Sequence, residues 1–385
     1  MKNSFNSSFV GRIIIFFAIM LTGFLVCTRV VSAEEINQKE IFTKAQVLEV
    51  SEDSTHLIES FGETYVTPYQ KLKLLIIDGT DTGKTVVVEY AGMTETSFQK
   101  VKVGQFLVLN QVEVAGGSTQ YQVVDKLRIN ELFMIILLFL VLVVLLSKWK
   151  GIGSILGMLF SLIVILKFII PQILAGRDPL LISILGSIAI LVTSIYLAHG
   201  FSKQTTVAVI STSITLVITG LLSVLFVRLT NLSGISNEDT SSLLFGGPTA
   251  TINYKGLLLG GMIIGFLGVL DDVTTGMSAT VFELKKVNSK LSFSELISSS
   301  LNVGVEHISS LVNTLVLAYA GSSLPVFLYL VLNPQGYPVW FMINSEFIAE
   351  EIVRTLVGSI GLLFAVPITT AIAAWIVTRN RRKSI

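Results

Sequence analysis

A series of long apolar runs, from residue 131 to the C-terminal region, constrains this chain more than any other feature of its sequence. An α-helix needs roughly 20 apolar residues to cross the hydrocarbon core of a bilayer, which is about 30 Å thick. The runs are close to that length, so we predict an α-helical multi-pass membrane protein. The expected spans lie near 131–147, 151–170, 180–199, 205–227, 256–280, 302–331 and 353–377.

Composition agrees with a bilayer as the main solvent. Hydrophobic residues make up 52% of the 385 residues and charged residues only 14%, whereas soluble domains carry about 25% charge. The net charge of +1, with basic residues spread over loop ends, excludes a nucleic-acid surface. The single cysteine, Cys27, excludes a disulfide within the chain and a cysteine metal cluster. We expect no metal, no cofactor and no ATP-binding motif.

The N-terminal segment 1–33 has the layout of a signal peptide. Lys2 and Arg12 precede an apolar stretch at 13–31, and Ser32-Ala33 supplies small residues at the cleavage position. The stretch is also long enough to remain as a signal anchor, which would bring the protein to about eight spans. Either outcome places residue 34 outside the cytoplasm.

Residues 34–128 have a different character. Short runs rich in Val, Ile and Thr at 45–50, 72–77, 85–90 and 106–109 are separated by turn signals such as Asp78-Gly79. Such runs indicate strands. Five or six strands in a segment of this length predict a small all-β domain, an OB-like barrel.

The segment 79–85, GTDTGKT, resembles a phosphate-binding P-loop after a strand. Only three residues separate its glycines, where that loop has four. The following Val86-Val87-Val88 continues as a strand, so the helix N-terminus that would bind phosphate is missing. We therefore predict a hairpin turn.

Lysine and arginine gather at alternate ends of the expected spans, which sets the orientation in the cell membrane. The opposite side holds only Arg177, with Arg228 and Lys255 at span edges. We predict an extracytoplasmic domain at 34–128 and a cytoplasmic C-terminus. The basic residues assigned to the cytoplasm are Lys148, Lys150, Lys203, Lys285, Lys286, Lys290, Arg379, Arg381, Arg382 and Lys383.

Two adjacent aspartates, Asp271 and Asp272, follow an apolar stretch at 256–270. That stretch makes only about 22 Å of helix, too short to cross the membrane alone. One interpretation draws both carboxylates into the membrane, one binding a cation or proton with Thr275 nearby and the other capping a helix break at Gly276. The other ends the span before the aspartates and leaves them among the lipid headgroups. Both stay open.

A polar stripe marks the sixth run. Glu306, His307, Ser310, Asn313 and Thr314 recur at three- and four-residue spacing on an otherwise apolar helix. Such a stripe must face other helices or water. It predicts either interhelical hydrogen bonds or a permeation or proton path.

Further interruptions are expected in the last two spans. Gly321 and Pro325 predict a break within the long segment 302–331, and Pro367 predicts a kink whose freed carbonyls nearby threonines would serve. Arg354 follows Glu350 and Glu351 at spacings that permit ion pairing.

The glycine pairs 256/260 and 261/265 predict close helix packing in the fifth run.

Three segments, 260–284 (GGMIIGFLGVLDDVTTGMSATVFEL), 312–328 (VNTLVLAYAGSSLPVFL) and 354–370 (RTLVGSIGLLFAVPITT), carry a family resemblance. The chain resembles the YibE/F-like family of bacterial membrane proteins over its whole length. The resemblance implies helical spans after an extracytoplasmic β-rich region, and a single aspartate after the glycine-rich run, matched by Asp271 or Asp272. Relatives have Arg-Asp where this chain has Glu306-His307, so a role for a basic residue there does not carry over.

These features favour a secondary transporter or permease for an ion or small solute, coupled to a cation or proton gradient. The alternative is a non-transporting scaffold or accessory subunit whose β domain binds a protein or envelope partner. An enzyme is disfavoured because no catalytic set appears. The expected partners are the lipid bilayer, a small solute or ion, and a second membrane subunit or homo-oligomer, with no nucleic acid. The assigned roles are coupling carboxylates at Asp271 and Asp272, relay groups at Glu306 and His307, and substrate contacts at Asn313 and Thr314.

Overall fold

A computed structural model describes residues 41–60, 63–91, 98–114, 118–236, 252–333 and 335–379. The expected signal segment at 1–33 lies outside these residues. The chain divides into two compact units, one covering Glu34–Leu142 and the other containing Val143–Ile385. The division falls inside a long helix that begins at Ile129, whereas the boundary was expected at 128/129. Residues 129–142 of this helix belong to the same unit as the sheet.

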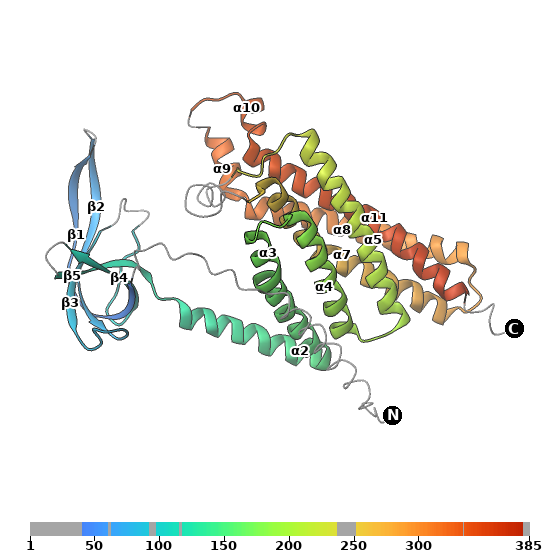
Figure 1. Cartoon of the computed structure of the whole chain (residues 1–385), viewed down its shortest axis with the longest axis horizontal. Coiled ribbons are helices and arrows are strands. Elements are labelled where there is room, and N and C mark those ends of the chain that lie inside the picture. The colour runs from blue at the N-terminus through green and yellow to red at the C-terminus, as the bar shows by residue number, and fades with distance from the viewer. Residues whose placement is uncertain are drawn as a thin grey trace. The chain divides into compact units, whose positions relative to one another are not determined.

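The first unit contains a curled five-stranded antiparallel sheet in the order β3-β2-β1-β4-β5 (Figure 1). Its central strand β1 is long and carries two bulges, which bend a sheet and increase its twist. The end strands β3 and β5 also contact each other, so the sheet curls into a half-barrel. The strands are β1 (Ile41–Ser60), β2 (Glu63–Ile76), β3 (Thr85–Ala91), β4 (Phe106–Val114) and β5 (Ser118–Lys126).

Alternation along the strands builds the core of this sheet, since every second side chain points to the inner face. The buried Gln70 side chain binds both the amide and the carbonyl of Val101, at 2.8 and 3.2 Å, and so closes one end of the core. The P-loop-like segment is the turn between β2 and β3, with Gly79 and Gly83 at φ 89° and 88°. The inner face consists of Ala45, Val47, Leu72, Leu74, Val88, Val101, Leu107 and Leu109.

Within the described residues, six helical segments are long and apolar enough to cross a membrane. The first, Ile129–Leu174, has 46 residues and covers both expected spans 131–147 and 151–170. It comprises α2 (Ile129–Val164), the π-helical turn η1 (Ile165–Ile169) and α3 (Ile170–Leu174). Lys148, at φ 52° and ψ −131°, interrupts α2 with a non-helical residue. The two expected spans are therefore one segment with a sharp bend between them.

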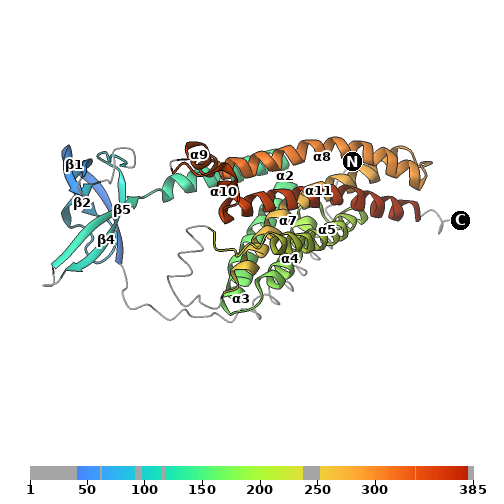
Figure 2. The same cartoon turned by 90° about the horizontal axis from the view of Figure 1, so that it is seen from above.

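The other five segments form a bundle around α7 (Tyr254–Val287), which contacts each of the other four. Figure 2 shows α8 along one edge of this bundle, beside α11 and α7. Two short helices, α9 (Leu324–Leu332) and α10 (Val339–Ile343), connect α8 to α11. The four neighbours of α7 are α4 (Pro179–His199), α5 (Lys203–Leu229), α8 (Phe293–Ser322) and α11 (Glu346–Arg379).

Four helices begin at a side-chain cap that accepts a backbone amide, the role that Ser, Asp and Asn fill best. The caps are Asp178 for α4, Ser202 for α5, Asn253 for α7 and Ser292 for α8. At α8, Glu295 completes a capping box with Ser292. These starts are therefore set by the local sequence.

Small residues and hydroxyl groups allow the bundle helices to approach closely. This is expected in a bilayer, where the hydrophobic effect does not drive helices together and close packing stabilises their contacts instead. A Cβ on Gly260 would lie 2.4 Å from the Ser183 hydroxyl, and one on Gly361 would lie 2.5 Å from that of Thr219. Along α5, hydroxyls donate to the carbonyl four residues earlier, which satisfies them without water. Those that do so and are fully buried are Thr212, Thr215, Thr219 and Ser223. Ser211 is also fully buried, but its hydroxyl has no hydrogen-bond partner among the described residues.

Candidate functional site

Asp271 and Asp272 lie near the middle of α7, which runs without interruption from Tyr254 to Val287. The helix break expected at Gly276 is therefore wrong. A glycine within a helix costs only about 1 kcal/mol relative to alanine. Breaking the helix would instead leave backbone groups without partners where no water can reach them. Neither aspartate caps a break.

A hydrogen bond fixes how deep the aspartates lie within the bundle. The Ser278 hydroxyl donates to the carbonyl of Gln204 at 2.8 Å, and Gln204 belongs to the first turn of α5. Asp271 is seven residues before Ser278 on α7, which corresponds to about 10 Å at 1.5 Å per residue. Asp271 thus lies about 10 Å further into the bundle than the start of α5.

The two carboxylates have different surroundings because successive residues on a helix point about 100° apart. The Asp271 carboxylate accepts a hydrogen bond from the Thr275 hydroxyl at 3.2 Å. The hydroxyl of Thr274 contacts that of Thr212 on α5 at 2.5 Å and also bonds the carbonyl of Asp271 at 3.2 Å. Asp271 therefore stands beside a buried contact between α5 and α7.

Asp272 points to a side of α7 that the neighbouring described helices leave largely open. We call this side the open face of α7 and define it by Gly261, Gly265, Gly268, Asp272 and Gly276. A Cβ on Gly261, Gly268 or Gly276 would meet no atom within 4 Å, and one on Gly265 would meet only the Tyr319 hydroxyl at 3.7 Å. The close packing expected of the 261/265 pair is therefore wrong for Gly261, whereas 256/260 packs against α4.

Two histidines stand near Asp272. His199, at the end of α4, and His307, on α8, both lie within the range of electrostatic attraction to its carboxylate. The sequence predicted a role for His307 but not for His199, because the two are far apart along the chain. Within the described residues, no group of three among His, Cys, Asp and Glu is placed to hold a metal ion.

The polar stripe of α8 faces away from the other helices. Glu306, His307, Ser310, Asn313 and Thr314 are all exposed, while Leu296, Ser300, Gly304 and Leu315 are the buried residues of α8. The stripe therefore does not line the interior of this bundle. Of its members, only His307 is near the aspartates.

Two contacts set the level of this stripe. A Cβ on Gly304 would lie 3.2 Å from Met277, and Tyr319 is near Gly265. The intervening part of α8 therefore runs beside residues 266–276 of α7. The stripe and the aspartates occupy the same layer of the bundle.

The interruptions expected in the last two spans, at Gly321 with Pro325 and at Pro367, differ in outcome. Helix α8 ends at Ser322, just after Gly321, and α9 begins at Leu324 with Pro325 in its first turn. By contrast, α11 remains helical through Pro367. The Thr369 hydroxyl donates to the carbonyl of Ala365 at 2.7 Å, not to that of residue 363, which lacks its usual partner because of the proline.

A second polar cluster lies at the start of α11. Glu350 is only 5% exposed, and its Oε1 has no hydrogen-bond partner among the described residues. Arg354 pairs with Glu351 at 3.0 Å. Glu346, which the sequence did not single out, accepts the amides of Ser233 and Gly234. This cluster ties the loop after α5 to α11.

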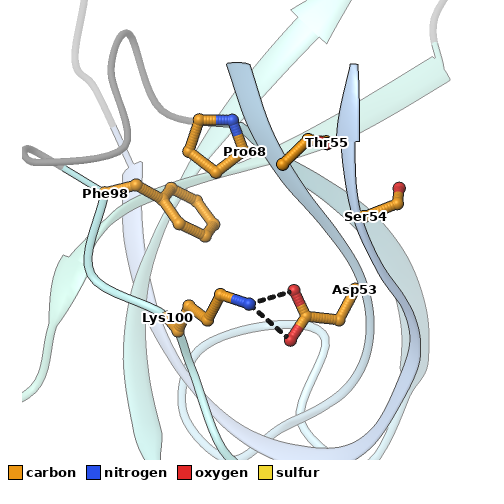
Figure 3. Close-up of a pocket in the computed structure, with 6 residues that line it drawn as sticks. All are labelled: Asp53, Ser54, Thr55, Pro68, Phe98 and Lys100. Carbon is orange, nitrogen blue, oxygen red and sulfur yellow. Dashed lines mark hydrogen bonds and ion pairs between the residues drawn. The ribbon is translucent and has the colours of Figure 1, made fainter. Parts of the chain in front are cut away.

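The sheet unit has a pocket of its own, of about 540 Å³ (Figure 3). The Lys100 ammonium binds both carboxylate oxygens of Asp53, at 2.9 and 3.0 Å. Figure 3 shows Phe98 and Pro68 next to each other above this pair. The pocket therefore combines an apolar wall with a charged floor.

The model of the YibE/F-like protein family matches residues 135–379, more than half of the chain. The chain belongs to the YibE/F-like family. The match begins beyond the sheet, so the sheet of this YibE/F-like protein lies outside the matched range, whereas the sequence resemblance was expected over the whole length. Neither the curated proteins nor the solved structures contain a match to the chain.

Proposed function

We propose that this YibE/F-like protein is a secondary transporter or permease for an ion or small solute. The observation that carries the proposal is the position of Asp271 and Asp272, midway along α7 and about 10 Å beyond the start of α5. On insertion scales, a carboxylate at the centre of a membrane costs about 2.5–3.5 kcal/mol. A carboxylate in that position is stabilised by a bound proton, by a bound cation or by contact with a water-filled route. Each of these is typical of transport proteins.

The two carboxylates divide the work in this proposal. Asp272 lies on the open face of α7 and is the group that takes up and releases the coupling proton or cation. His199 and His307 lie near it on the helices at either side. Asp271, with its Thr275 hydrogen bond, holds a second charge close by. Glu306, Asn313 and Thr314 lie in the same layer but on the outward side of α8, so in this proposal they do not contact the solute.

The proposed route differs from that of transporters with broken helices at the midplane, because α7 is continuous. Its floor is instead the row of glycines on the open face of α7, which leaves room beside the helix. A solute or hydrated ion would pass along this face. The two aspartates would contact the solute or ion near the middle of this route.

Proton flux into proteoliposomes tests the proposal. A valinomycin-driven potassium potential is applied, and an enclosed pH-sensitive dye reports the flux for the wild type, Asp271→Asn, Asp272→Asn and the double variant. We expect at least tenfold less flux for Asp272→Asn and for the double variant. Glu283→Gln is the matched control, since Glu283 lies on the same helix but is exposed and pairs with Lys286 at 3.1 Å. Unchanged flux in all three aspartate variants would sink the proposal.

Orientation and topology complete the proposal. The bend at Lys148 lets the segment Ile129–Leu174 cross twice, since its 46 residues would make a helix of about 69 Å, more than twice the hydrocarbon thickness. Together with the charge pattern, this supports a sheet outside the cytoplasm and a cytoplasmic C-terminus. The order of the strands and the contact between β3 and β5 support an OB-like barrel for the sheet.

A second candidate function rests on the pocket in Figure 3. Its apolar wall and charged floor suit a peptide or envelope component, as expected of an accessory subunit that recruits a partner. Crosslinking from a photoreactive group at Thr55, on the pocket rim, compares the wild type with Phe98→Ala. A specific crosslinked partner that is lost in Phe98→Ala would support this function, and its absence would count against it.

A further inference from the structure

The outward face of α8 carries polar groups that no described residue of this chain satisfies. Asn302, Glu306 and Asn313 are exposed, and none of the three makes a hydrogen bond within the described part of the chain. The apolar residues around them favour a bilayer, where lipid tails offer neither donors nor acceptors. Lipid is therefore a poor cover for this face.

The helix has no means of hiding these groups by rotation. The opposite side is fixed against α7 and α11 by Gly304, where a Cβ would lie 2.5 Å from Val366, and by the buried residues Leu296 and Leu315. Turning α8 to bury Asn313 would expose that side. The polar face therefore stays uncovered by the described residues of this unit.

We infer that the outward face of α8 is an interface with a second copy of this chain, related by a two-fold axis along the membrane normal. In such an arrangement each residue meets groups at its own depth, and contacts are reciprocal. Asn302 lies one turn before Glu306 on the same face, so its amide can donate to the Glu306 carboxylate of the other copy. Asn313 carries both a donor and an acceptor and can pair with its own counterpart.

The size of the side chains agrees with this interface. Ser309 and Ser310 lie between Glu306 and Asn313, and Thr314 follows, so the centre of the face is made of small polar residues. Small residues let two helix backbones approach closely, and Asn and Ser hydrogen-bond across helices in membranes. The position of α8 at the edge of its bundle leaves this side free (Figure 2). This inference does not depend on the transport proposal.

Disulfide crosslinking in native membranes tests the interface directly. Because Cys27 is the only cysteine, Cys27→Ser gives a background without cysteine, into which Asn313→Cys or Ser310→Cys is placed. With copper phenanthroline we expect at least ten times more covalent dimer from these two than from two controls. Leu315→Cys probes the buried side of the same helix, and Leu221→Cys probes an apolar side chain of α5 that is 66% exposed.

A matched pair of variants separates pairing from folding. Asn313→Val removes an unsatisfied group, whereas Thr314→Val removes a hydroxyl that already donates to the carbonyl of Ser310 at 2.9 Å. Photobleaching step counts in dilute liposomes should show at least a threefold loss of dimer for Asn313→Val and little change for Thr314→Val. Monomers in the wild type, crosslinks to a different protein, or labelling of residue 313 by an impermeant maleimide without dimers would each overturn the inference.

Discussion

The hydroxyl groups of Thr212 and Thr274 lie 2.5 Å apart between α5 and α7. Both side chains are fully buried, and each is also near a backbone carbonyl of its own helix, that of Ala208 at 2.8 Å and that of Asp271 at 3.2 Å. Each hydroxyl has a single hydrogen, so one donates to its carbonyl and the other donates across the interface. The contact fixes α5 against α7 within one turn of Asp271.

We predict a small but measurable coupling between these two threonines. Hydrogen bonds between membrane helices contribute on average about 0.6 kcal/mol, so Thr212→Val and Thr274→Val should show a coupling energy of about that size in a double-mutant cycle. Reversible unfolding in mixed micelles measures it. The control pair is Thr215→Val with Thr274→Val, because Thr215 bonds the carbonyl of Ser211 on its own helix and should show no coupling.

The glycines of α7 give a second prediction. Gly268→Leu should leave folding intact, because a side chain there meets no atom within 4 Å, but should reduce proton flux at least tenfold by filling the open face one turn from Asp272. Gly260→Ala should instead destabilise the fold, because the added Cβ would lie 2.4 Å from the Ser183 hydroxyl oxygen. Thermal stability and liposome flux, measured on both variants, separate these effects. Full flux in a folded Gly268→Leu protein would exclude the open face as the route.

Much of this architecture is present in the sequence as local pattern. Apolar runs, strand alternation and turn glycines depend on near neighbours, so they predicted the helices, the sheet and the turn at Gly79. The polar stripe of α8 was equally visible, because helical spacing brings its members to one side. Its direction was not, because both sides of α8 contain small and apolar residues. Only the packing of Gly304 and Leu315 shows which side is outward.

The errors have a common physical cause. Gly276 and Gly261 were interpreted by residue type, as a break and as a packing site, but the neighbours of a glycine decide its role. The same limit hid His199, which approaches Asp272 only through the packing of α4 on α7. The buried hydroxyls of α5 gave little signal, since most of them, such as those of Thr215 and Thr219, donate to a carbonyl of their own helix.

The bend at Lys148 leads to a prediction about topology. A residue at φ 52° and ψ −131° is strained unless it is glycine, so Lys148→Gly should retain or raise stability while keeping the bend. In the background without cysteine, a cysteine at residue 149 should react with an impermeant maleimide only from the cytoplasmic side. Cysteines at residues 128 and 177 should react only from the outside. Labelling of 128 and 177 from opposite sides would show a single crossing.

The pH dependence of the sheet unit provides the last prediction. Burial, together with the hydrogen bond to Asp81 and the negative charge of that residue, raises the pKa of Tyr121 to about 12. An unfolded tyrosine titrates near pH 10. The stabilisation from protonated Tyr121 is therefore complete below about pH 10 and is lost as the pH rises towards the folded value.

Asp81 has the opposite dependence, since its hydrogen bonds with Lys84 and Tyr121 lower its pKa. Its stabilisation is present above the unfolded value, about 4, and is lost as the pH falls through the lower folded value. Circular dichroism melts of residues 34–128 from pH 2 to 12 should show both losses. Tyr121→Phe should remove much of the alkaline loss, and Asp81→Asn should reduce both, because the two side chains share one hydrogen bond. An alkaline loss of equal size in Tyr121→Phe and the wild type would assign it to Tyr69 and Tyr90, whose pKa values are also raised.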